Sequence, residues 1–139
     1  MINVMGGGGE SDSVFVPILN DTDKSNPLMS TSCYDNFDVI FIENVGNLIC
    51  PSDFILGTHK RIVVVSITEG PWVIRKHPML FKFSDIAVIN KIDLIDVIDV
   101  DIEEMIRDAL EINPNIKVIT TSANTEENIP ELVKEIFSN

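Results

Sequence analysis

The fold follows from the stretch Ile86-Ala87-Val88-Ile89-Asn90-Lys91-Ile92-Asp93, in which four apolar residues lead into a polar turn. Runs that are apolar throughout, rather than at alternate positions, are typical of strands buried on both faces of a parallel sheet. Similar runs occur at Val39–Ile42, Arg61–Ile67 and Lys117–Thr120, separated by stretches that can hold a helix. This alternation predicts an α/β fold with a mostly parallel sheet flanked by helices and right-handed connections.

Two of the intervening stretches have clear helical periodicity. From Ile102 to Glu111, apolar residues recur at i, i+3, i+4, i+7 and i+8, and Asp101 with Glu104 forms a plausible capping box. The last helix repeats this spacing from Ile129, with Pro130 in its first turn. Both helices can cover one face of the sheet. A further short helix is expected before Phe83.

Composition and charge narrow the functional classes. The 139 residues, 45% of them hydrophobic, are enough for one domain with one core. The net charge of −12, from 22 acidic and 10 basic residues, repels a nucleic-acid backbone and an anionic membrane surface alike. The apolar runs are shorter than the roughly 20 residues of a membrane span, the two cysteines form no disulfide framework, and no signal peptide is recognisable. We expect a soluble, cytoplasmic protein.

The first part of the chain differs in composition from the rest. Residues 1–34 are largely linker-like, with four glycines at Gly6–Gly9 and a polar stretch before the first predicted strand. Within them, Val14–Leu19 has the composition of a short edge strand, because Pro17 is tolerable only at an edge. Residues 35–139 form the α/β part.

The polar turn after the third run has the chemistry to select guanine. The Asp93 carboxylate can accept hydrogen bonds from both the ring N–H and the exocyclic amino group of guanine, and adenine offers neither in that geometry. Asn90 would tie the loop together, and the aliphatic stem of Lys91 would lie along the ring. The alternative is a polar turn that only closes a strand.

A second element, Thr121-Ser122-Ala123, follows the next strand. Here the backbone N–H of Ala123 could meet the guanine carbonyl, and Ser122 belongs to the same loop. Ligands of parallel sheets bind at the carboxyl ends of the strands, so the two elements are expected to lie together.

The third element is Glu43-Asn44-Val45-Gly46, at the end of the first run. Glu43 could hold Mg²⁺ through water, and Gly46 lets the backbone approach a terminal phosphate. Otherwise Glu43 is an acid at a strand end above a glycine turn.

A metal site is a separate possibility. Cys50 lies in the loop that follows Gly46 and could bind Ni²⁺ or Zn²⁺ as a thiolate, although one ligand does not make a site. The other soft ligands are Cys33, His59 and His77, and their spacing matches no local metal motif.

The longer motifs resemble one family. Residues 41–51 (Phe41-Ile42-Glu43-Asn44-Val45-Gly46-Asn47-Leu48-Ile49-Cys50-Pro51), 56–66, Thr68-Glu69-Gly70 and residues 90–94 are similar to the hydrogenase-maturation nickel-incorporation GTPases over roughly residues 35–139. The resemblance implies a P-loop G-domain that dimerises on GTP binding, hydrolyses GTP with Mg²⁺, and delivers nickel to the hydrogenase large subunit with a partner metallochaperone. Glu43 and Gly46 match the switch II positions. Asn90, Lys91, Asp93, Ser122 and Ala123 match base-binding positions, and Cys50 matches a metal-binding cysteine at the dimer interface.

The chain departs from this family upstream of Glu43. No Gly-x-x-x-x-Gly-Lys-Ser/Thr stretch is present, and Gly6–Gly9 offers neither the lysine for phosphates nor the hydroxyl for Mg²⁺. We therefore expect the phosphate-loop strand and helix to be missing, which would leave a gap between the first two predicted strands. Three hypotheses remain: a GTPase of this family, a non-catalytic relative that at most binds metal or dimerises, and an α/β binding domain whose motifs are coincidental.

Overall fold

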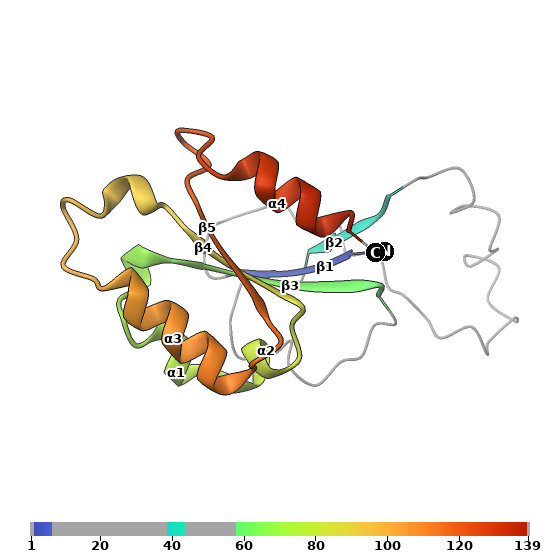
Figure 1. Cartoon of the computed structure of the whole chain (residues 1–139), viewed down its shortest axis with the longest axis horizontal. Helices are drawn as coiled ribbons and strands as arrows, with labels where there is room; N and C mark the ends of the chain where they lie inside the picture. The colour runs from blue at the N-terminus through green and yellow to red at the C-terminus, as the bar shows by residue number, and fades with distance from the viewer. Residues whose placement is uncertain (1, 7–38, 44–57, 139) are drawn as a thin grey trace, which may run out of the picture.

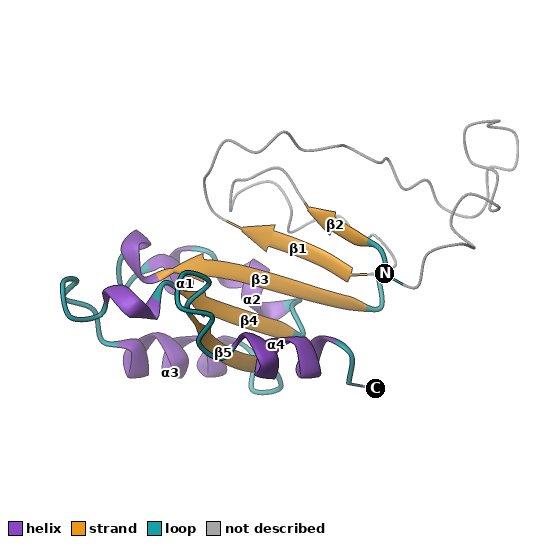
Figure 2. Cartoon of the chain, turned by 90° about the horizontal axis from the view of Figure 1, so that it is seen from above, coloured by secondary structure: helices purple, strands orange, loops and turns teal. Residues whose placement is uncertain are grey.

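The computed structural model describes residues 2–6, 39–43 and 58–138 (Figure 1). Within these residues, five strands form one sheet in the order β2-β1-β3-β4-β5, and every neighbouring pair is parallel. The strands are β1 (Ile2–Gly6), β2 (Phe41–Glu43), β3 (Lys60–Ser66), β4 (Ile86–Asn90) and β5 (Lys117–Thr121). In Figure 2 the arrowheads of β1, β2 and β3 point the same way. The predicted α/β fold with a mostly parallel sheet is confirmed.

One detail of the expected fold is wrong. The position between β2 and β3, predicted to lack its strand, is filled by β1, whose Ile2 pairs with Phe41 on one side and with Lys60 on the other. This strand is only five residues long, contains the polar Asn3 and ends at Gly6, so it lacks the continuous apolar pattern of the other strands. Its assignment depends on two neighbours that are distant in sequence. The possible strand Val14–Leu19 and the expected absence of the helix lie outside the described residues.

The other elements lie close to their predicted positions. The helices are α1 (Val73–Lys76), α2 (Pro78–Lys82), α3 (Ile102–Ile112) and α4 (Ile129–Ile136), with two short 3-10 helices, η3 (Ile67–Glu69) and η4 (Ile92–Leu94). Pro130 lies in the first turn of α4, as predicted. Asp101 caps α3 by accepting a hydrogen bond from the Glu104 N–H at 3.2 Å. No helix in the described parts of the chain combines the length and apolar character needed to cross a bilayer.

The helices cover both faces of the sheet, so the expectation that α3 and α4 share a face is wrong (Figure 1). The face under α1, α2 and α3 buries Val63, Val65, Ala87 and Ile89, together with Met105 of α3. The opposite face buries Ile62, Ile86, Val88 and Ile119, with Leu132 and Ile136 of α4 packed against them. The connections from β3 to β4 and from β4 to β5 join parallel neighbours in the same direction along the sheet, so crossovers of the usual right hand place their helices on one side. Since α4 leads from β5 into no further strand of the described sheet, no crossover within that sheet fixes its side.

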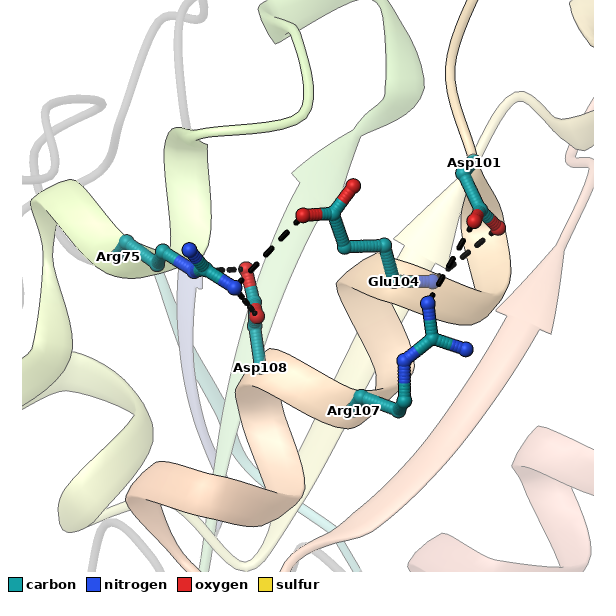
Figure 3. A network of polar contacts seen from close by, with 5 residues as sticks. All are labelled: Arg75, Asp101, Glu104, Arg107 and Asp108. Atoms are coloured by element: carbon teal, nitrogen blue, oxygen red, sulfur yellow. Dashed lines mark hydrogen bonds and ion pairs between the residues drawn. The ribbon is translucent and has the colours of Figure 1, made fainter.

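An ion pair attaches α1 to α3 (Figure 3). Arg75 donates to Asp108 through Nε at 2.7 Å and through Nη2 at 2.6 Å, while its Nη2 lies 3.7 Å from Glu104. The Asp108 side chain is only 2% exposed, and that of Arg75 is 49% exposed. The bond to Asp108 raises the pKa of the Arg75 guanidinium, which also lies over the Trp72 ring at 5.5 Å. The bidentate geometry compensates for burying the carboxylate.

Replacing Arg75 alone should therefore be more damaging than replacing the whole pair. Arg75→Ala leaves the Asp108 carboxylate buried without its guanidinium, and the urea midpoint should fall. The double variant Arg75→Met with Asp108→Leu should recover much of that loss, because it removes the buried charge as well. Equal midpoints for wild type and Arg75→Ala would contradict this account.

A second prediction concerns the end of α3. The Asn113 Nδ2 donates to the backbone oxygens of Ser84 at 3.0 Å and Phe81 at 3.2 Å, which joins the ends of α2 and α3. Asn113→Ala leaves partly buried carbonyl groups without this donor and should lower the free energy of unfolding by about 1–2 kcal/mol. The matched control is Asn115→Ala, at an exposed site nearby, which should change it by less than about 0.5 kcal/mol. Equal losses in the two variants would contradict the assigned role.

Candidate functional site

Two of the predicted elements leave the sheet side by side. Asn90 ends β4, Thr121 ends β5, and the two residues are partners in the parallel register. Their loops therefore emerge together at the carboxyl edge of the sheet, where ligands of such folds bind. The expected proximity of the Asn90–Asp93 and Thr121–Ala123 elements is confirmed.

The backbone turns sharply after β4. Lys91 has φ 67° and ψ 35°, in the left-handed region, and the 3-10 turn η4 follows at once. The Leu94 N–H donates to the Lys91 carbonyl at 3.0 Å and closes this turn. A left-handed conformation costs a residue other than glycine roughly 1–2 kcal/mol, so the contacts that hold the loop must offset it.

Asn90 supplies one of those contacts. Its Oδ1 accepts a hydrogen bond from the Thr121 hydroxyl and another from the Ala123 N–H, both at 3.2 Å. Because a backbone N–H can only donate, the Ala123 contact fixes which amide atom of Asn90 faces β5. Asn90 therefore ties its own loop to the loop after β5.

Asp93 is the acid at the centre of this arrangement. Its Oδ1 accepts a hydrogen bond from the Ser122 hydroxyl at 2.6 Å, and its Oδ2 accepts one from the Asn124 Nδ2 at 3.4 Å. Ser122 is fully buried, and its Oγ also accepts the Thr125 N–H at 3.1 Å. Since the hydroxyl accepts from Thr125, its single proton is available for Asp93. Ser122 thus sets the position of the Asp93 carboxylate.

The loop after β5 is held by its own polar residues. The Ser122 N–H donates to the Glu127 carbonyl at 3.2 Å, and the Asn128 side chain donates to the Thr120 carbonyl at 2.9 Å. Glu126 and Asn128 have φ values of 61° and 57°, which close the loop tightly. Sequence reasoning included Ser122 but missed Asn124 and Asn128. The sequence feature that indicates their role is the cluster of small polar residues after β5. Such residues favour hydrogen bonds from side chains to nearby backbone groups.

The neighbouring strand also ends in a closed turn. Ser66, the register partner of Asn90, caps η3: its Oγ accepts the Thr68 N–H at 3.2 Å, and Glu69 Oε2 accepts the Ser66 N–H at 3.1 Å. This capping box was readable as a serine followed three residues later by a glutamate, but sequence reasoning did not use it. It stiffens the sheet edge beside the loops that follow β4 and β5.

The remaining predicted site residues are not in this group. Glu43 ends β2 at the far side of the sheet, three strand spacings or about 14 Å from β4, and it is exposed. Gly46 and Cys50 lie outside the described residues, as does Cys33. Among the described residues, no three His, Cys, Asp or Glu side chains gather in a way that could hold a metal ion.

Comparisons with known proteins identify the family of this chain. The nucleotide-binding domain family CobW/HypB/UreG matches residues 15–120. The probable hydrogenase maturation factor HypB of Methanocaldococcus jannaschii is 54% identical over 102 residues, which are 73% of this chain and 46% of that protein. HypB of Escherichia coli K12 is 41% identical over 93 residues, which are 67% of this chain and 32% of that protein. The chain spans less than half the length of these two relatives.

One of two similar solved structures overlaps this chain more fully. The crystal structure of hydrogenase maturation factor HypB from Archaeoglobus fulgidus has a TM-score of 0.81 at 32% identity, covering 99% of this chain and 87% of that one. The structure of HypB from Helicobacter pylori in complex with nickel has a TM-score of 0.58 at 28% identity, covering 71% and 49%. On the family match and the Archaeoglobus overlap, the chain belongs to the CobW/HypB/UreG family of nucleotide-binding domains and is a relative of the HypB hydrogenase maturation factors.

Proposed function

We propose that this chain binds guanine nucleotide through the loops after β4 and β5. This binding would be part of nickel insertion during hydrogenase maturation. The observation that carries the proposal is the Asp93 carboxylate, held by the buried Ser122 at the carboxyl edge of the sheet. A carboxylate has about four acceptor positions, of which the buried Ser122 occupies one on Oδ1, while Oδ2 is contacted only at 3.4 Å by the exposed Asn124 side chain. The residues present therefore fit a base that offers two adjacent N–H donors.

The base contacts follow from hydrogen-bond chemistry. Asp93 would accept the ring N–H and the exocyclic amino group of guanine, and an adenine at the same place would offer the carboxylate neither of these two donors. The stem of Lys91 would cover the ring, and Asn90 holds the two loops at the correct separation. The Ala123 N–H already donates to Asn90. Its expected contact with the guanine carbonyl therefore requires that bond to be shared or exchanged.

GTP hydrolysis is the second candidate, and the position of β1 favours it. This strand lies between β2 and β3 and ends at Gly6, which three further glycines follow in the sequence. Glycine backbone N–H groups after a central strand can bind phosphates. In this reading Glu43 binds Mg²⁺ through water and Gly46 approaches the terminal phosphate. The sequence still supplies no lysine of the usual phosphate loop, so a non-catalytic relative is the competing proposal.

The metal and the partners are proposed from the relatives. HypB of H. pylori has been solved in complex with nickel. For this chain we propose that Cys50 is a ligand for Ni²⁺ or Zn²⁺, that the protein dimerises, and that it works in the cytoplasm with a nickel metallochaperone and the hydrogenase large subunit.

The base specificity can be tested by exchanging one atom group. Asp93→Asn replaces a carboxylate oxygen with an amide donor, which no longer suits the guanine amino group but suits the 2-carbonyl of xanthine. The variant should bind fluorescent GDP about 10- to 100-fold more weakly than wild type. It should gain affinity for XDP in the same titration. ADP should compete poorly with fluorescent GDP in both proteins.

The competitors also separate the two candidate functions. If phosphates contribute, GDP and GTP should displace the probe far better than guanosine, with a dependence on Mg²⁺, and phosphate release should be measurable. If the protein recognises the base alone, guanosine should compete nearly as well and no phosphate should be released. A wild type that binds no guanine compound, or an Asp93→Asn variant with unchanged preference, would refute the base site.

The metal proposal has its own test. Cys50→Ala should abolish stoichiometric retention of Ni²⁺ or Zn²⁺ after desalting, measured by elemental analysis, because the thiolate supplies the soft ligand. Cys33→Ala is the matched control and should retain the metal. Retention by Cys50→Ala would assign the metal to other side chains.

A further inference from the structure

Asn124 contacts Asp93, the acid proposed to bind the guanine base. Its side-chain Nδ2 donates to Asp93 Oδ2 at 3.4 Å, while Ser122 donates to Oδ1 at 2.6 Å. A primary amide presents a planar NH₂ donor, as does the exocyclic amino group of guanine. The amide of Asn124 thus offers Asp93 the same kind of bond that the base would offer.

The two donors to Asp93 differ in how firmly they are held. Ser122 is fully buried, makes a short bond to a charged acceptor, and is also bound through the Thr125 N–H and the Glu127 carbonyl. Asn124 is exposed, and its bond is near the upper limit for a hydrogen bond. A ligand that needs Asp93 would therefore displace Asn124 and leave Ser122 in place.

We propose that Asn124 is an internal competitor for the guanine base, whereas Ser122 is the positioning residue that keeps Asp93 oriented in both states. This inference rests on the proposed function. In the free protein, Asn124 donates a hydrogen bond to Oδ2 of Asp93. This bond lowers the free-energy cost of holding a carboxylate at the sheet edge. On binding, the base takes over that oxygen, and the Asn124 amide turns to solvent. Because the bond between Asn124 and Asp93 must break first, guanine binds more weakly than its own contacts with Asp93 would allow.

Removing the competitor should therefore tighten binding. Asn124→Ala deletes a bond that exists only in the free state, so guanosine, measured by competition with fluorescent GDP, should bind about two- to fivefold more tightly. The matched control is Asn115→Ala, an exposed asparagine just before β5 and at the opposite edge of the sheet, which should leave the affinity unchanged. Unchanged or weaker guanosine binding by Asn124→Ala would overturn the proposal.

Thermal unfolding supplies a readout that a merely structural role would not produce. If Asn124 bonds to Asp93 only in the free protein, Asn124→Ala should lower the midpoint of the free protein and leave that of the guanosine-saturated protein unchanged. Equal losses with and without guanosine would mean that Asn124 supports the loop in both states, and this would overturn the proposal.

Asp93→Asn separates a failure of this inference from a failure of the proposed function. If wild type binds guanosine and Asp93→Asn loses it, the base site stands, and the Asn124→Ala result alone decides the competition. If wild type shows no guanine-selective binding, or Asp93→Asn retains it, the base site fails and the inference is overturned with it.

Discussion

The pairing of β1 with both of its neighbours is the constraint on which the shape of the sheet depends. β2 is joined to the rest of the sheet by its pairing with β1, since the strand order is β2-β1-β3-β4-β5. The strands β3, β4 and β5, in contrast, share continuous buried side chains with α3 on one face and α4 on the other. The pairing of the five residues of β1 therefore places Glu43 at the same carboxyl edge of the sheet as the loop that carries Asp93.

Among β3, β4 and β5, the register between β4 and β5 sets the geometry of the two loops that follow these strands. The pairing of Asn90 with Thr121 brings Asn90 within bonding distance of Thr121 and Ala123, and it allows Ser122 to reach Asp93. Because side chains alternate along a strand, a shift by one residue would send them to the opposite face. The buried apolar residues of β4 and β5 make such a shift costly, so the hydrophobic core specifies the polar site above it.

The sequence was sufficient for the parts with a strong local pattern. The runs at β3, β4 and β5 and the periodicity of α3 and α4 placed these elements within a few residues, and the motifs at Asn90 and Thr121 predicted that their two loops lie together. β1 was missed because its five residues have no such pattern, and the face covered by α4 was misjudged because no crossover rule applies to a final helix. The roles of Ser122 and Asn124 depend on contacts with Asp93 some 30 residues away, which spacing alone does not reveal.

In the proposed function, the base would bind at the loops after β4 and β5, and the phosphates would bind near β1 and Glu43. This separation limits how the protein could act as a nucleotide-dependent switch. A ligand shifts a conformational equilibrium only by the difference in its affinity for the two states. GTP and GDP carry the same base, so the proposed contacts through Asp93, Asn90 and Lys91 would distinguish guanine from adenine but could not distinguish GTP from GDP. If the chain takes part in the proposed nickel insertion through GTP hydrolysis, its two states would therefore have to arise at the other side of the sheet, at β1 and Glu43. If that end contributes nothing, the chain can bind guanine nucleotide specifically and still not act as a switch.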